Sequence, residues 1–78
     1  MSKKKVTIQE AMDHADDIDV YSALQQFPAR KTLTRSDLQN VYNYSHAAKN
    51  HQNVKPFVKR AGLSGSASLT QLIQSAIK

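Results

Sequence analysis

The sequence has 78 residues, no cysteine, and 11 Lys and Arg against six Asp and Glu, which gives a net charge of +5. A chain of this length forms one domain with a thin core, and the absence of cysteine excludes a disulfide framework and a thiolate metal site. Its two glycines and two prolines are too few for a turn-rich β fold, and no apolar stretch suits a signal peptide or a transmembrane helix. We therefore expect a cytoplasmic protein without a membrane partner.

The charges are segregated along the chain. Residues 1–5 carry three lysines, residues 6–27 carry five acids and no Lys or Arg, and residues 28–78 carry eight basic residues against one acid. A small domain with one acidic and one basic end presents a dipolar field to charged partners. We expect residues 1–5 to form a basic disordered tail and residues 6–78 to form a single helical domain.

Two helices are predicted in the N-terminal half. Thr7-Ile-Gln-Glu10 is a capping box, in which the threonine hydroxyl and the glutamate carboxylate each bond the other residue's amide. It opens a short helix over about residues 8–16. Asp17 or Asp19 can cap a second helix, which ends before Pro28 because proline disfavours helical geometry in the preceding residue.

Three further helices are predicted after a basic loop over residues 28–33. Thr34 caps a long helix that continues to about Lys49, and Pro56 suits the first turn of a fourth helix that Gly62 terminates. Ser68 opens the last helix with a second capping box. The predicted fold class is all-α, a small compact bundle of four to five short helices. Its expected buried residues include Leu38, Val41, Tyr42, Phe57, Leu72 and Ile73.

Enzymatic and metal-binding functions have little support in the sequence. The acids between Glu10 and Asp19 fit a solvated helix face and helix caps better than an acid–base pair. The chain has no strand–turn–helix nucleophile pattern and no glycine-rich phosphate loop. His46 and His51 are five residues apart, whereas two metal ligands on one helix face need a spacing of three or four. We therefore predict a protein that is not an enzyme and needs neither a metal nor a cofactor.

The basic part of the chain predicts binding to DNA or RNA. Clustered cations attract phosphates and release their counterions, while uncharged side chains along an exposed helix face can read base edges. Gln39, Asn43, His46 and Asn50 provide such a face, and Tyr44 could stack on an unpaired base. The predicted nucleic-acid-binding residues are Arg30, Lys31, Arg35, Gln39, Asn43, Lys49, Lys55, Lys59 and Arg60.

One stretch has a recognisable pattern. Phe57-Val-Lys-Arg-Ala-Gly-Leu-Ser64, followed by Leu69-Thr-Gln-Leu-Ile73, resembles the two helices of a helix-turn-helix. In that motif a small residue and a turn of the type Ala-Gly-Leu-Ser precede the recognition helix. The resemblance agrees with a regulator that binds nucleic acid, although the connection here is about one residue too long. The expected recognition helix offers Thr70, Gln71 and Gln74, with no Arg or Lys near its start.

Protein binding is the alternative prediction. The acidic segment could dock on a basic partner or mimic phosphate charge, as in small accessory or inhibitor proteins, which include phage-encoded ones. A chain with a thin core could also cover apolar surface by forming a homodimer. A third explanation is that the acidic helices pair with the basic ones inside the chain. The residues predicted for a protein-binding site are Glu10, Asp13, Asp16, Asp17 and Tyr21.

Overall fold

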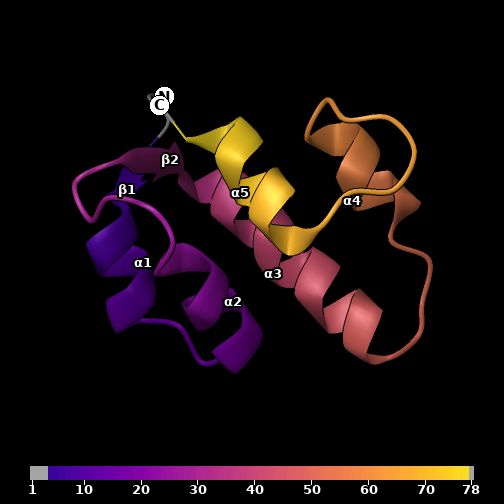
Figure 1. Ribbon diagram of the computed structural model, residues 1–78, viewed down its shortest axis with the longest axis horizontal. Helices are drawn as coiled ribbons and strands as arrows, with labels where there is room; N and C mark the ends of the chain where they lie inside the picture. The colour runs from indigo at the N-terminus through magenta and orange to yellow at the C-terminus, as the bar shows by residue number, and fades with distance from the viewer. Residues whose placement is uncertain (1–3, 78) are drawn as a thin grey trace.

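A computed structural model describes residues 4–77 of the chain. It is mostly helical, which confirms the coarse prediction, and the longest helix runs diagonally through the molecule with the other helices around it (Figure 1). The described elements, in chain order, are β1 (Lys5–Thr7), α1 (Ile8–Asp13), α2 (Ile18–Leu24), β2 (Thr32–Thr34), α3 (Arg35–Lys49), α4 (Lys55–Arg60) and α5 (Leu69–Ala76).

The prediction of a strictly all-α fold is wrong, because β1 and β2 form an antiparallel sheet in which Val6 pairs with Leu33. Each strand leads directly into a helix, and the threonine at the junction is the N-cap: Thr7 for α1 and Thr34 for α3. An N-cap residue has extended backbone, with φ −75° and ψ 159° at Thr7 and φ −74° and ψ 157° at Thr34. The two extended helix entries lie side by side and pair as strands.

The sheet also satisfies the first amides of the helices that follow it. The amide of Ile8 donates to the carbonyl oxygen of Lys31 at 2.8 Å, and the amide of Arg35 donates to that of Lys4 at 3.0 Å. Such amides have no partner inside their own helix. The sheet therefore begins within the segment expected to be a tail, since Lys5 lies in β1. Residues 1–3 of that segment lie outside the described residues.

The caps predicted from the sequence set most helix boundaries. Both capping boxes form, at Thr7 and at Ser68. Asp17 caps α2 and needs an extended backbone to do so, with φ −102° and ψ 118°, so the chain leaves the helical conformation before it. α1 itself ends at Asp13 rather than near residue 16, and residues 14–17 connect it to α2.

Two helices end in the same left-handed motif. After α4, Gly62 has φ +79°, and the amide of Leu63 donates to the carbonyl oxygen of Val58 at 3.2 Å. After α3, His51 takes the equivalent position with φ 56°, and the amide of Gln52 donates to the carbonyl oxygen of Ala47 at 2.8 Å. Both are Schellman motifs, which usually place glycine at the left-handed residue. The first was predicted from Gly62, and the second was not.

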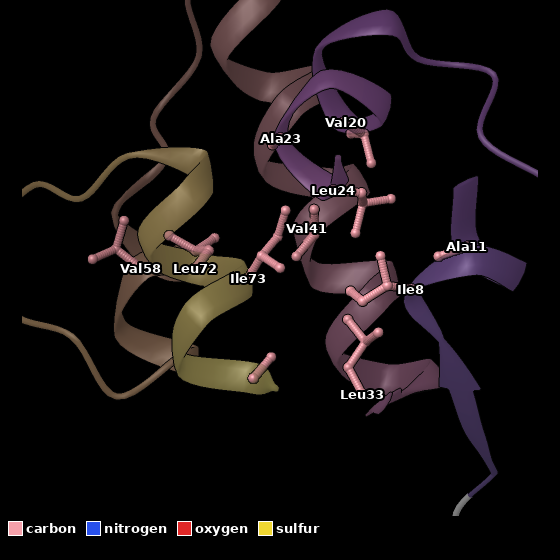
Figure 2. Packing of buried hydrophobic residues seen from close by; sticks show 11 residues of the cluster. Ile8, Ala11, Val20, Ala23, Leu24, Leu33, Val41, Val58, Leu72 and Ile73 are labelled. Atoms are coloured by element: carbon pink, nitrogen blue, oxygen red, sulfur yellow. The ribbon is translucent and has the colours of Figure 1, made fainter. Parts of the chain in front are cut away.

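The core lies around α3 and contains residues from α1, α2, α4, α5 and β2 (Figure 2). The burial predicted for Val41, Leu72 and Ile73 is confirmed, since each is at most 1% exposed. Leu38, Tyr42 and Phe57 are only partly buried, so their predicted burial is wrong in degree. On α4, the core residue is Val58 rather than Phe57. On α3, Leu38 and Tyr42 line a depression because the short α1 does not cover them fully. The other core residues are Ile8, Ala11, Val20, Ala23, Leu24, Leu33 and Ala76.

Candidate nucleic-acid interface

Most of the acidic side chains are used by the fold itself. The carboxylate of Glu10 accepts a hydrogen bond from the amide of Thr7 at 3.2 Å and completes the α1 capping box. The carboxylate of Asp13 accepts from Nε2 of Gln9 at 2.9 Å. Three acids predicted for a protein-binding site, Glu10, Asp13 and Asp17, therefore have structural partners within the chain.

Asp17 is the most heavily bonded of these acids. Its Oδ1 accepts from the amide of Asp19 at 2.8 Å and from Nζ of Lys49 at 2.8 Å, and its Oδ2 accepts from Oγ of Ser45 at 2.7 Å. Burial raises the pKa of Asp17, but the bonds from Lys49, Ser45 and two backbone amides outweigh it and hold the pKa at about 2 instead of 3.8. The Asp17 carboxylate is therefore ionised at neutral pH and joins the start of α2 to the end of α3.

This ion pair connects the two sites predicted from the sequence. Lys49 was predicted to bind nucleic acid and Asp17 to bind protein, yet they bind each other, and the carboxylate of Asp19 lies 3.6 Å from the same ammonium group. For Lys49, the third explanation therefore holds: an acidic helix end pairs with a basic one inside the chain. Of the remaining residues predicted for protein binding, Asp16 is exposed and Tyr21 is partly buried.

The other basic side chains of the predicted interface are exposed. Among residues 4–77, Lys49 alone forms a salt bridge with another described side chain. The exposed cations fall into two groups, one around β2 and one on α4, and Figure 1 shows these two elements on opposite sides of α5. We call Arg30, Lys31 and Arg35, which lie around β2, the sheet cluster, and Lys55, Lys59 and Arg60, which lie on α4, the α4 cluster.

Two further cations, which the sequence did not predict as binding residues, adjoin the sheet cluster. Lys4 and Lys5 are exposed and lie beside the start of α3, because the carbonyl oxygen of Lys4 accepts from the amide of Arg35. Both lysines lie in the segment that the sequence predicts to be a disordered tail. The pairing of Val6 with Leu33 is what brings them to the basic loop.

The amide side chains on α3 are arranged in pairs. Nε2 of Gln39 donates to Oδ1 of Asn43 at 3.0 Å, and Nδ2 of Asn50 donates to the carbonyl oxygen of His46 at 2.8 Å. The first pair keeps Oε1 of Gln39 as an acceptor and Nδ2 of Asn43 as a donor, with no further bonds to described residues. One acceptor beside one donor matches the major-groove edge of adenine. The predicted stacking of Tyr44 is less well placed, because its hydroxyl donates to the carbonyl oxygen of Ala67 at 2.6 Å.

The segment that resembles a helix-turn-helix differs from that motif in geometry. Residues 61–68 separate α4 from α5, whereas the motif joins its helices with a turn of about three or four residues. Two polar residues of the expected recognition helix are also engaged inside the chain. Gln71 completes the α5 capping box, and Oγ1 of Thr70 accepts from Nε2 of Gln26 at 3.3 Å.

Two adjoining depressions form a groove between α1 and α3, which we call the α1–α3 groove. They have volumes of about 340 and 480 Å³ and share His14, Leu38, Gln39 and Tyr42 as lining residues. Burial, followed by the charges of Asp16 and Asp17, raises the pKa of Tyr42. The groove brings together residues from both predicted sites. Its other lining residues are Val6, Glu10, Ala11 and Arg35 in the first depression and Asp16, Asp17, His46 and Lys49 in the second.

Comparison with known proteins gives no family model, no curated protein and no solved structure that matches this chain. Over residues 4–77, no helix has the length and apolar character to cross a membrane. The same residues contain no group of three or more His, Asp or Glu side chains placed to hold a metal ion. Any assignment of function therefore depends on the charges and surfaces described above.

Proposed function

We propose that this protein is a small non-enzymatic regulator that binds nucleic acid through exposed basic side chains. The observation that carries the proposal is that most acidic side chains are bonded within the fold, whereas most basic side chains of the described residues are exposed without an acidic partner. Four of the six acids have partners within the fold: Glu10 in a helix cap, Asp13 with the side chain of Gln9, and Asp17 and Asp19 beside Lys49. Eight basic side chains are exposed and have no acidic partner in the described part of the chain: Lys4, Lys5, Arg30, Lys31, Arg35, Lys55, Lys59 and Arg60.

This distribution favours an anionic polymer as the partner. The net charge of +5 and the exposed cations attract phosphates, and the counterions released from those phosphates contribute free energy to binding. In this proposal the sheet cluster and the α4 cluster contact phosphates. The amide pair of Gln39 and Asn43 lies on α3, which begins at the sheet cluster, and contacts a base edge.

The direct test is the fluorescence anisotropy of labelled DNA and RNA oligonucleotides titrated with the protein over a series of salt concentrations. We expect saturable binding at near-physiological salt and a linear fall of log affinity with log salt. Nuclease treatment should release the protein from a cell extract fraction that contains nucleic acid. The absence of binding to both polymers at near-physiological salt would contradict the proposal.

A second candidate function is protein binding through the α1–α3 groove. The specific observation is that Leu38 and Tyr42, which helical periodicity places on the core side of α3, are only partly buried and line this groove. Glu10 and Arg35 bring opposite charges to its walls, as expected for a protein or homodimer contact. Sedimentation of the wild type and of Leu38→Gln over a range of concentrations tests the homodimer. A concentration-dependent dimer that the substitution abolishes would support it, and two monomers would exclude it.

A further inference from the structure

A separate depression lies between α4 and the chain that follows it. It has a volume of about 450 Å³, and in Figure 1 the connection to α5 loops around the outer end of α4. The Schellman motif at Gly62 turns the chain back, and the positive φ of Gly65, +72°, bends it again. The lining residues are Lys55, Val58, Lys59, Leu63, Ser64 and Gly65.

The walls of this depression offer hydrogen-bond donors of the kind that bind phosphate. Lys55 and Lys59 are four residues apart on α4 and therefore one helical turn apart on the same face. Both are exposed, and neither forms a salt bridge with another residue of the described range. The backbone amides of Ser64 and Gly65 donate to no other described residue. No acidic residue lines the depression.

The floor of the depression is apolar. Its two apolar lining residues are Leu63, which is partly buried, and Val58, which is 2% exposed. Phosphate alone gains nothing from such a floor, whereas a nucleobase presents an apolar face that packs on apolar side chains once it is unstacked. In a duplex that face is covered by the neighbouring base pairs, and in a single strand it is accessible.

We infer that this depression binds one nucleotide of a single-stranded nucleic acid, with the base on Leu63 and the phosphate on Lys55, Lys59 and the Ser64–Gly65 amides. The inference rests on the proposed function and deepens it, because it names the strandedness of the ligand and the centre of the interface. The sheet cluster then contributes phosphate contacts at a distance from this centre.

Two double variants that remove the same charge test the location of the site. Lys55→Gln with Lys59→Gln changes the depression, and Arg30→Gln with Lys31→Gln changes the sheet cluster. The probes are a labelled oligothymidylate and a labelled duplex of equal length, followed by anisotropy at fixed salt. We expect the first variant to lose roughly tenfold or more in affinity for the oligothymidylate and the second to lose several-fold less. The wild type should prefer the oligothymidylate to the duplex.

A single substitution at the exposed Ser64 tests the same site without removing a cation. Ser64→Glu places a negative charge beside the two lysines, and Ser64→Gln adds nearly the same volume without charge. We expect the glutamate variant to lose roughly tenfold in affinity and the glutamine variant to stay within about twofold. Circular dichroism spectra and melting curves that match the wild type establish that each variant is folded.

The possible failures are distinguishable. Equal losses in the two double variants, or equal effects of the two Ser64 substitutions, would contradict the site while the wild type still binds nucleic acid. Equal affinity for the duplex and the oligothymidylate would contradict the binding of an unstacked base. Absence of binding by the wild type to either probe would contradict the proposed function, and the inference with it.

Discussion

The ammonium group of Lys49 lies 2.8 Å from Oδ1 of Asp17 and joins the last turn of α3 to the N-cap of α2. Each charge is also at the helix end that favours it, since a helix N-terminus attracts an anion and a C-terminus attracts a cation. The pair removes one cation from the interface predicted on the sequence and one acid from the alternative site. It therefore separates the charges that hold the fold from those available to a partner.

The first prediction concerns the role of Asp17 in stability. Asp17→Ala removes the N-cap of α2 and leaves the hydroxyl of Ser45, which is 3% exposed, without its acceptor. It should lower the free energy of unfolding by about 2 kcal/mol. Asp17→Asn keeps a capping oxygen and should cost less. The matched control is Asp16→Asn, at an exposed position, which should stay within about 0.5 kcal/mol of the wild type. Urea denaturation measures all three, and equal costs at the two positions would contradict the assigned role.

The second prediction concerns pH. The pKa of Asp17 is about 2 in the folded protein against an ordinary value of 3.8, so below pH 3.8 the unfolded chain takes up a proton that the folded chain does not. The stabilisation by Asp17 is thus fully present above about pH 5 and is lost as the pH falls toward 2. The stability difference between the wild type and Asp17→Asn should shrink over this range. A difference that stays constant from pH 5 to pH 2 would contradict the low pKa.

The third prediction uses the two Schellman motifs as a matched pair. His51 holds a φ of 56°, which strains a residue with a side chain, and Gly62 holds +79° without strain. His51→Gly should therefore raise the free energy of unfolding by up to about 1 kcal/mol, and Gly62→Ala should lower it by about 1 kcal/mol. Thermal melting measures both, and the same sign of change at the two positions would contradict this description of the helix ends.

The fourth prediction concerns the amide pair on α3. Because Gln39 and Asn43 bond each other, Asn43→Ala and Gln39→Ala should have similar effects on base recognition. We expect each to reduce the discrimination between bases by about 1–3 kcal/mol and to leave the salt dependence of binding unchanged. Competition between oligonucleotides of different composition measures the first quantity. An equal loss of affinity for all sequences, without a change in discrimination, would assign these residues to phosphate contacts.

The starts of four helices could be predicted because the hydrogen bonds that cap them are local. Thr7, Asp17, Thr34 and Ser68 each accept from an amide two or three residues ahead, so the relation is visible within a few letters of sequence. The sheet could not be predicted in this way. Its strands have three residues each, too few for an alternating pattern to show.

The candidate interface depended on relations between distant residues. Exposure of the cations could be expected from the local composition, because polar loops and polar helix faces contain few apolar residues. The structure places four of them at the surface: Arg30, Lys31, Lys55 and Lys59. The pairing of Lys49 with Asp17 joins segments far apart in the sequence, and no local pattern indicates which of the six acids a given lysine will contact. Helical periodicity likewise identified the side of α3 that carries Leu38 but not how completely α1 would cover it.

The salt dependence of oligonucleotide binding, measured with Lys59→Gln and Lys49→Gln in parallel, tests most directly the claim that exposed cations bind nucleic acid. Both variants lose one charge, but Lys59 has no acidic partner among the described residues and Lys49 is paired with Asp17. We predict that Lys59→Gln reduces the slope of log affinity against log salt by about 0.7 for a single strand and that Lys49→Gln leaves the slope unchanged. Equal slopes for the two variants, or no binding by the wild type at near-physiological salt, would contradict the claim.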